Sequence, residues 1–155
     1  MNYCLGFIFD QQLEKVLLIE KNKPEVFKGR LNGIGGKIEK DESGADAMVR
    51  ECREETGLII NDWKSFCSLE GEGFKVYCYY AVTDDVFNFK QMEEEFLGLY
   101  DLYAVKDAWT GQAGPISDKF VGNYSRLFNL DWLIPMAINH HLRLDKCQYF
   151  EIKEK

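Results

Sequence analysis

Three glutamates near the middle of the chain, Glu51, Glu54 and Glu55, have the residue type and spacing of a cation site. On a helix, positions i, i+3 and i+4 lie on one side, with Cβ atoms about 5–6 Å apart. Three negative charges at that separation repel one another, and a bound cation would remove the repulsion. Oxygen ligands that leave positions free for water and phosphate are those that Mg²⁺ prefers. The alternative interpretation is a solvated acidic face, the usual meaning of such a run.

Two further charged residues could orient these carboxylates. Arg50 lies four residues before Glu54, so its guanidinium can hold that carboxylate in place. Glu42, at the start of the expected helix, can also pair with Arg50. Upstream, the glycine-rich run 33–36 (Gly-Ile-Gly-Gly) lets main-chain carbonyls and amides approach a ligand closely.

The element that must position these groups is a helix over residues 43–56. An apolar stripe at i, i+3, i+4 and i+7 predicts it. The stripe consists of Ala45, Met48, Val49 and Cys52. Ser43 suits the N-terminus, where a side-chain oxygen can accept from a free amide, and Gly57 suits the position after the last turn.

The spacing of these residues carries a resemblance. From Gly36 the sequence reads Gly, five residues, Glu42, seven residues, and then Arg-Glu-Cys-Arg-Glu-Glu-Thr-Gly-Leu, which ends at Leu58. This resembles the Nudix box, G-x5-E-x7-R-E-U-x-E-E-x-G-U, in which U is a bulky apolar residue. All seven fixed residues match, and Cys52 is the one soft departure because it is smaller than the usual aliphatic residue.

The resemblance implies a fold, a reaction and a cofactor. Nudix domains have an α/β (α+β) fold, a mixed β-sheet sandwiched between helices, and we expect one such domain over residues 1–155. The family hydrolyses a phosphoanhydride bond in nucleoside diphosphate derivatives, usually with Mg²⁺ or Mn²⁺. The chain is therefore expected to be a pyrophosphohydrolase that acts on an acid anhydride.

Carried over position by position, the box assigns roles to its residues. Glu51, Glu54 and Glu55 are expected to bind the metal, and the carbonyl of Gly35 or Gly36 to add a ligand. Arg50 and Glu42 are expected to orient the carboxylates. The attacking water gives its proton to one carboxylate or to a base elsewhere, and we favour Glu54 or Glu55.

Many family members add a carboxylate from a later loop. The segment 99–102, Leu-Tyr-Asp-Leu, resembles the aromatic-rich strand that follows that loop in the family. By this spacing we expect Glu94 to be a further metal ligand. The alternative is that Glu94 belongs to an exposed acidic loop.

Residues 30–39 are similar to the corresponding strand of MutT-like hydrolases of oxidised purine nucleoside triphosphates. Asn32 is a candidate for contact with a base, because an amide side chain can both donate to and accept from a purine edge. It could instead bond to the main chain in a turn. The candidates for contact with the substrate phosphates are Lys21, Lys23, Lys28 and Arg30, although a solvated basic loop is the simpler interpretation. Lys37 is a further candidate for substrate binding. Trp109, in a polar segment, is a candidate for stacking on the base.

Sub-family markers outside the box are mostly absent. By elimination, the expected reaction converts a (deoxy)nucleoside triphosphate, including an oxidised purine such as 8-oxo-dGTP, to the monophosphate and pyrophosphate. Two alternatives stay open: hydrolysis of ADP-ribose or a dinucleoside polyphosphate, and a non-catalytic Nudix domain that senses a nucleotide. Sensing domains usually have eroded box glutamates, and those of this chain are intact.

Composition restricts the partners and the compartment. The 155 residues carry a net charge of −7, which argues against binding to a nucleic acid polymer, and no apolar run approaches the roughly 18 residues of a membrane span. The N-terminus reads as a first strand without the basic and small-residue regions of a signal peptide. Five cysteines without Cys-x-x-Cys spacing indicate buried thiols in a reducing, cytoplasmic environment. The oligomeric state is left open.

Hydrophobic patterning predicts the remaining elements. Residues 31–38 read either as a strand in close main-chain contact or as a strand that ends in a loop. Residues 106–122 read as a loop, and residues 124–141 as a helix with a break near Pro135. Further strands are expected over residues 3–9, 15–20, 63–69, 74–83, 96–105 and 146–152.

Overall fold

The computed structural model describes residues 1–102, 130–142 and 150–153. These residues form two α-helices, two 3₁₀ turns and one sheet of seven strands. The helices are α1 (Gly44–Thr56) and α4 (Leu130–Leu142), and the 3₁₀ turns are η1 (Glu25–Phe27) and η2 (Asp84–Asn88). The strands are β1 (Asn2–Phe9), β2 (Lys15–Glu20), β3 (Leu31–Asn32), β4 (Lys64–Gly71), β5 (Phe74–Val82), β6 (Phe96–Asp101) and β7 (Phe150–Lys153).

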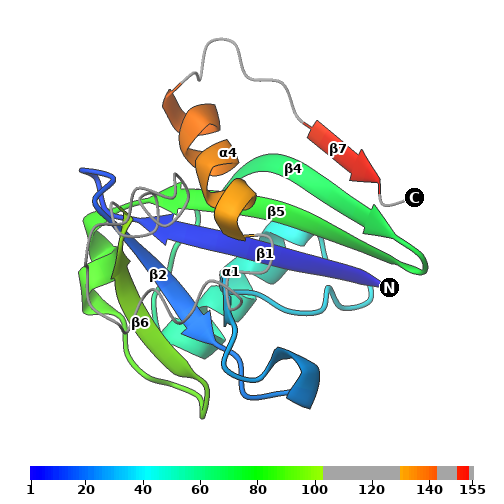
Figure 1. Ribbon diagram of the computed structural model, residues 1–155, viewed down its shortest axis with the longest axis horizontal. Coiled ribbons are helices and arrows are strands. Elements are labelled where there is room, and N and C mark those ends of the chain that lie inside the picture. The colour runs from blue at the N-terminus through cyan, green and yellow to red at the C-terminus, as the bar shows by residue number, and fades with distance from the viewer. Residues whose placement is uncertain (103–129, 143–149, 154–155) are drawn as a thin grey trace.

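The sheet is mixed. Its order is β3-β2-β1-β5-β4-β7, and β6 pairs with the free edge of β2. β1 runs parallel to β5 and β4 runs parallel to β7, whereas the other pairs are antiparallel. The long β1–β5 pair crosses the centre of the molecule (Figure 1) and gives the two helices a common platform.

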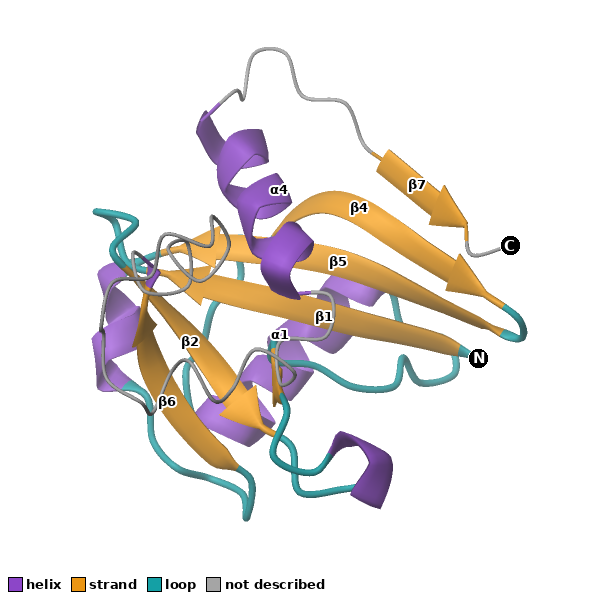
Figure 2. Ribbon diagram, viewed as in Figure 1, coloured by secondary structure: helices purple, strands orange, loops and turns teal. Residues whose placement is uncertain are grey.

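The two helices lie on opposite faces of this sheet. In Figure 2, α4 crosses in front of β5 and β1, and α1 lies behind them. The face toward α4 buries an aromatic-rich set that includes Phe7, Phe9 and Tyr80. The face toward α1 buries Ile8, Ile34 and Met48. The expected arrangement, a mixed sheet sandwiched between helices, is confirmed.

β1 and β2 separate soon after the turn that joins them. Ile8 pairs with Leu17 and Phe9 with Val16, after which residues 31–37 run between the two strands. Leu31 and Asn32 pair with the end of β2, whereas Ile34 and Lys37 form single bridges to Gly6 and Tyr3 of β1. The segment thus changes partner strand at residue 33.

The structure combines the two readings of residues 31–38: the strand ends at Asn32, and the chain continues as a loop in close main-chain contact with β1. The chain approaches β1 so closely that a Cβ atom at Gly33 would lie 2.6 Å from the carbonyl oxygen of Gly6. At Gly35 an added Cβ would overlap the carbonyl oxygen of Cys4, and the φ angle of +144° is one that glycine tolerates. The glycines therefore serve main-chain contact, as one of the two readings of this stretch required.

The C-terminal helix differs from its prediction. α4 continues through Pro135, where a break was expected. A proline removes one intrahelical hydrogen bond, but Leu133, Ile134 and Ala137 on both sides of it are buried against the sheet. This packing keeps the helix continuous. Residues 103–129 and 143–149, with the expected loop at 106–122 and the starts of the last helix and strand, lie outside the described residues.

Two sequence expectations concern the cysteines and the membrane. Cys4, Cys52, Cys67 and Cys78 are buried free thiols, and Cys147 lies outside the described residues. In the described segments, each helix is too short or too polar to cross a lipid bilayer.

Candidate active site

α1 begins and ends as its sequence predicts. The hydroxyl of Ser43 accepts a hydrogen bond from the amide of Asp46, which caps the first turn. Gly57 adopts a left-handed conformation with φ of 70°, and its amide donates to the carbonyl of Arg53. These two caps fix which residues of the box are helical.

The buried face of α1 is rotated from the predicted stripe. Ala45 is exposed, and the residues buried in its place include Ala47 and Glu55. The reason is that Glu55 finds hydrogen-bonding partners inside the protein, so a carboxylate takes a position next to Met48 and Cys52 on the inner face. The three box glutamates consequently differ in exposure: the side chain of Glu55 is 6% exposed, that of Glu51 14% and that of Glu54 47%.

Three successive residues after the change of partner strand contact three residues of the helix. The amide of Gly35 donates to Glu55 Oε2 at 3.0 Å. The missing side chain of Gly36 makes room for Glu51, whose Oε1 would lie 2.5 Å from an added Cβ. The carbonyl of Lys37 accepts from Arg50 at 3.0 Å. The glycine-rich segment is therefore the support against which the box helix is aligned.

Arg50 is the centre of the first group of charges, which we call the Arg50 cluster (Arg50, Glu42, Glu51 and Glu54). Its guanidinium donates twice to Glu42, at 2.9 and 3.1 Å, and once each to Glu51 at 2.8 Å and Glu54 at 3.1 Å. Glu42 also accepts from the amide of Glu39, which fixes the turn before the helix. The planar guanidinium thus orients three carboxylates together.

Protonation in this cluster follows these contacts. The hydrogen bonds from Arg50 and from the Glu39 amide lower the pKa of Glu42. Burial raises the pKa of Glu51, against the opposing effect of Arg50. The hydrogen bond to Glu42 raises the pKa of Arg50, so its charge is permanent.

Lys21 is the centre of the second group, which we call the Lys21 cluster (Lys21, Glu55 and Glu95). Its ammonium nitrogen lies 2.9 Å from Glu95 Oε2 and 3.8 Å from Glu55 Oε1. The second oxygen of Glu95 accepts from the amide of Asn22 at 2.8 Å. All three side chains are at most 19% exposed, so these charges interact with little screening by water.

The two carboxylates of the Lys21 cluster are shifted in opposite directions. Burial raises the pKa of Glu55 to about 7, and the ammonium of Lys21 and the Gly35 amide only partly offset this effect. Burial also acts on Glu95, but the hydrogen bonds from Lys21 and from the amides of Asn22 and Lys23 outweigh it and lower its pKa. At neutral pH, Glu95 is therefore the firmly charged partner.

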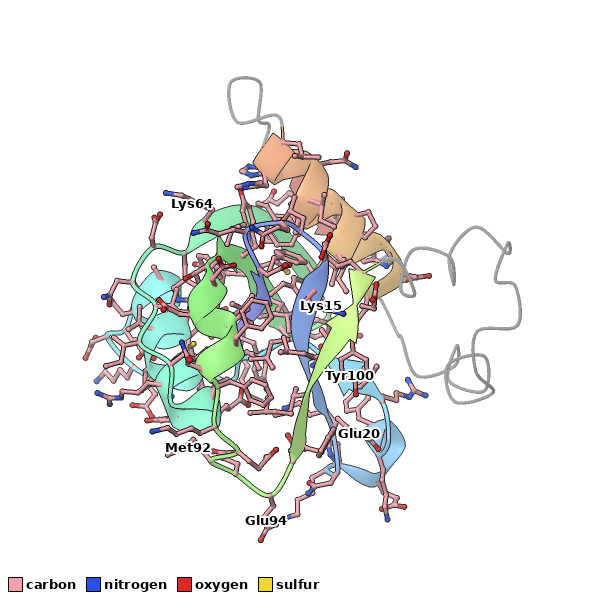
Figure 3. All side chains as sticks on the ribbon, turned by 90° about the vertical axis from the view of Figure 1, so that its left-hand side faces the viewer. Lys15, Glu20, Lys64, Met92, Glu94 and Tyr100 are labelled. Atoms are coloured by element: carbon pink, nitrogen blue, oxygen red, sulfur yellow. The ribbon has the colours of Figure 1, made fainter. Side chains whose placement is uncertain are left out.

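The structure places Glu94 away from the box helix. Its side chain is 83% exposed and lies 3.7 Å from Lys23, at the outer tip of the loop before β6 (Figure 3). The neighbouring Glu95, which the sequence analysis did not select, points inward to Lys21. Residues 93–95 form a bend just before β6, in which Glu94 faces solvent and Glu95 faces Lys21.

The predicted substrate residues fall in three places. Asn32 is half-buried on β3, and its side-chain oxygen accepts from the amide of Gly33, the main-chain role that the sequence had left open. The guanidinium of Arg30 lies 5.8 Å from the centre of the Phe27 ring. The side chain of Lys37 is exposed, and Trp109 lies outside the described residues.

The donor set on α1 fits a hard divalent cation by its chemistry. Glu51, Glu54 and Glu55 offer carboxylate oxygens, and the adjacent glycine segment offers main-chain carbonyls. In the described part of the chain, no group of three His, Cys, Asp or Glu side chains has the arrangement of a metal site, and the box carboxylates are paired with Arg50 and Lys21. Arg50 and Lys21 neutralise part of the negative charge of these carboxylates.

A cavity of about 350 Å³ lies at the other end of the sheet. Its lining includes Asp62, Tyr80, Thr83 and His141, at the ends of β5 and α4, and none of the predicted site residues that the structure describes. It is therefore separate from both charged clusters.

Comparison with known proteins identifies relatives of this arrangement. A family model described as NUDIX domain matches residues 4–146. A search of curated protein sequences found no match. A structure of MutT, from work on Aliivibrio salmonicida and Vibrio cholerae, has a TM-score of 0.59 and 21% identity, and the match covers 82% of this chain and 98% of that chain.

Two other solved structures share the fold. The NUDIX domain of Shewanella oneidensis NrtR, solved with ADP ribose, has a TM-score of 0.56 and 18% identity over 81% of this chain and 84% of that chain. A hydrolase of the NUDIX family from Clostridium perfringens has a TM-score of 0.53 and 20% identity over 83% of this chain and 96% of that chain. At these identities, the likeness shows a common fold.

Proposed function

The chain belongs to the NUDIX family of pyrophosphohydrolases, and we propose that it converts a (deoxy)nucleoside triphosphate to the monophosphate and pyrophosphate. An oxidised purine nucleotide such as 8-oxo-dGTP is included in this substrate class. The observation that carries the proposal is the alignment of an intact box helix by residues 35–37, which contact Glu55, Glu51 and Arg50. Intact box glutamates favour hydrolysis over nucleotide sensing.

The cofactor in this proposal is Mg²⁺ or Mn²⁺, held by Glu51, Glu54 and Glu55. Of the two candidate carbonyls, we favour that of Gly35, because the carbonyl of Gly36 already accepts from the amide of Cys4 at 2.9 Å. We replace Glu94 with Glu95 as the further carboxylate of the site, since Glu95 lies beside Lys21 and Glu55. When bound, such a cation neutralises phosphate oxygens and lowers the pKa of a water that it coordinates.

The residues of the chain have distinct tasks in this reaction. Glu54 is our candidate for the proton acceptor, because its side chain is 47% exposed and can reach a water in the substrate site. Glu55 is less suited, since both of its oxygens face partners inside the protein. Arg50 orients Glu51 and Glu54, and positioning of this kind supplies much of the catalysis in phosphoryl transfer.

The experiment that tests the proposal is a substrate panel with purified protein and Mg²⁺ or Mn²⁺. It contains dGTP, 8-oxo-dGTP, dATP, ADP-ribose and diadenosine polyphosphates, and products are separated by chromatography. Monophosphate and pyrophosphate from a triphosphate are expected. Cleavage confined to ADP-ribose or a dinucleotide would keep the mechanism and overturn the substrate.

A pair of variants tests the role of the box. Glu54→Gln should lower kcat by roughly a hundredfold or more, the usual contribution of general acid–base catalysis, and keep the fold. Glu72→Gln, an exposed glutamate in the β4–β5 turn, is the matched control and should leave kcat unchanged. Full activity of Glu54→Gln would remove that residue from the proposed mechanism.

A further inference from the structure

The two carboxylates of the Lys21 cluster are held in the same way. One oxygen of each accepts from a main-chain amide: Glu55 Oε2 from Gly35 at 3.0 Å, and Glu95 Oε1 from Asn22 at 2.8 Å. The other oxygen of each, Oε1 of Glu55 and Oε2 of Glu95, faces the ammonium of Lys21. The amides fix the direction of both carboxylates, so their second oxygens face the same cation.

The charges in this cluster do not balance. When Glu55 is ionised, one ammonium lies between two carboxylates, and Glu93 adds a further negative field that acts on Glu55. At these low exposures the excess negative charge is costly, and it raises the affinity of the place for a cation of higher charge. A divalent cation would balance both carboxylates, whereas a monovalent ammonium balances only one of them.

The side chain of Lys21 can leave while its main chain stays. The amide of Lys21 donates to Arg30 at 2.8 Å, and its carbonyl accepts from Gly29 at 2.7 Å, which fixes the main chain beyond the end of β2. The ammonium itself is a compact charge on a flexible stem, with one short contact, to Glu95. Withdrawal of the side chain would therefore leave the sheet and the loop unchanged.

We propose that Lys21 is a built-in counter-ion, which occupies the place of a divalent cation between Glu55 and Glu95 and withdraws when that cation binds. Lys21 thereby sets the affinity of the site for its metal and keeps the two carboxylates together in the metal-free protein. The inference rests on the proposed function in one respect: the metal is taken to bind at the carboxylates of the box helix.

The test measures Mn²⁺ binding to the metal-free full chain, without substrate, by electron paramagnetic resonance. Lys21→Met removes the competing charge and should tighten Mn²⁺ binding by roughly tenfold, the lower end of the effect that neighbours of metal ligands have on affinity. Lys21→Arg keeps the charge and should bind Mn²⁺ as the wild type does, or more weakly. Unchanged or weaker binding by Lys21→Met would overturn the proposal.

The chain offers a matched control two residues away. Lys23 pairs with Glu94 at 3.7 Å, but both side chains are at least 80% exposed. Lys23→Met removes the same charge and should leave Mn²⁺ affinity unchanged. If it tightened binding as much as Lys21→Met, the effect would be one of overall charge and the assigned role of Lys21 would be wrong.

The melting temperature provides a second measurement, which applies even if Lys21→Met is less stable than the wild type. Addition of Mn²⁺ should raise the melting temperature of Lys21→Met by more than that of the wild type, because the metal replaces the missing counter-ion. Equal increases in both proteins would contradict the proposal. Lys21→Gln, which keeps a polar side chain, provides the same comparison if Lys21→Met does not fold.

The outcomes separate this inference from the proposed function. If the wild type binds Mn²⁺ and cleaves nucleotides but Lys21→Met binds the ion no more tightly, the inference alone is overturned. If Lys21→Met binds Mn²⁺ more tightly and no nucleotide is cleaved, the inference is supported and the proposed function fails. A wild type that binds no Mn²⁺ would overturn both.

Discussion

The Arg50 cluster and the Lys21 cluster both include glutamates of α1, and both contact the same glycine-rich segment, but they are built differently. Arg50 makes five hydrogen bonds to four residues, among them Glu42 and the carbonyl of Lys37. Lys21 makes one short contact and lies 3.8 Å from a second carboxylate. The guanidinium of Arg50 is held by several directional hydrogen bonds, whereas the ammonium of Lys21 is held mainly by charge attraction.

The Arg50 cluster therefore aligns the carboxylates, whereas the Lys21 cluster can exchange its ammonium for another cation. A planar guanidinium with several partners loses all of them if it moves, so the Arg50 cluster should keep one arrangement through the reaction. A lone ammonium can be replaced by another cation at little structural cost. The following experiments act on the segment that the clusters share, on each cluster in turn, and on a residue outside both.

The largest effect is expected from Gly35→Ala, which strikes the segment that both clusters share. The new Cβ would overlap the carbonyl of Cys4, and the φ angle of +144° is unfavourable for alanine. We expect the free energy of unfolding to fall by about 3 kcal/mol or more, the upper end for single substitutions. Urea denaturation measures it.

Gly36→Ala is the matched control for this variant. Its Cβ meets the carboxylate of Glu51, a side-chain end that can move. The loss of stability should be smaller than in Gly35→Ala, and the loss of kcat should exceed what stability explains. Equal destabilisation of the two variants would show that the contact with Cys4 is not the critical one.

The next largest effect is expected from Arg50→Met, which removes the centre of the first cluster. Hydrogen bonds to charged groups contribute roughly 1.5–3 kcal/mol each to stability, but the Arg50 side chain is 23% exposed. We therefore expect the free energy of unfolding to fall by about 2 kcal/mol, measured by urea denaturation. Arg50→Lys restores the charge without the planar geometry and should recover little activity. If added Mg²⁺ restored the activity of both variants, Arg50 would not be needed to orient the carboxylates.

A smaller effect, of opposite sign, is expected from Glu55→Gln in the second cluster. Burial raises the pKa of Glu55 from 4.5 to about 7, so the stability that its protonation contributes is present below pH 4.5 and is lost as the pH rises to about 7. Without metal, Glu55→Gln should therefore be more stable than the wild type at pH 8, by about 1–2 kcal/mol. The difference should vanish near pH 4.

Denaturation in the presence of a chelator, at pH 4 and at pH 8, measures this difference. The side-chain oxygen of glutamine can still accept from the Gly35 amide, so the comparison isolates the charge. A lower stability of Glu55→Gln at pH 8 would mean that the attraction to Lys21 outweighs the cost of burial, and the two clusters would then be alike.

The smallest effect is expected from Ser43→Ala at the start of α1. Loss of the bond from the Asp46 amide should cost about 1 kcal/mol of stability. Because Ser43 belongs to neither cluster, Mn²⁺ affinity and the pH dependence of stability should not change. A shift in either quantity would show that the clusters depend on the end of the helix as well as on their own contacts.

The sequence predicts the Arg50 cluster better than the Lys21 cluster. Arg50, Glu51 and Glu54 lie within one helical turn, and Glu42 lies eight residues before Arg50, so helix geometry and the box spacing are enough to bring them together. The predicted pairs of Arg50 with Glu54 and Glu42 are both present in the structure. Local periodicity is therefore enough to predict the Arg50 cluster.

The Lys21 cluster depends on strand register. Lys21 and Glu95 are 74 residues apart, and they meet because Glu20 of β2 pairs with Phe96 of β6, which places the residues just beyond them side by side. The spacing argument that selected Glu94 could not supply this register, which brings Glu95 next to Lys21. Residues 93–95 form a bend, so strand alternation in the sequence gives no signal for the choice between Glu94 and Glu95.

In the sheet, too, local sequence patterns predict some features and tertiary packing decides others. The hydrophobic runs of β1, β2 and β5 predicted strands close to the observed ones, because each is decided by its own residues. The change of partner at Gly33 and the continuity of α4 through Pro135 depend on tertiary packing, which no single segment encodes.

The bond from the Gly35 amide to Glu55 Oε2 also gives the protein an internal spectroscopic probe. An amide proton bound to a carboxylate resonates far from one bound to a carboxylic acid or to water, so the nuclear magnetic resonance signal of Gly35 should follow the state of Glu55 directly. One glycine cross-peak would thus report, without a label or a substrate, whether the buried carboxylate carries a proton, faces Lys21 or binds a metal.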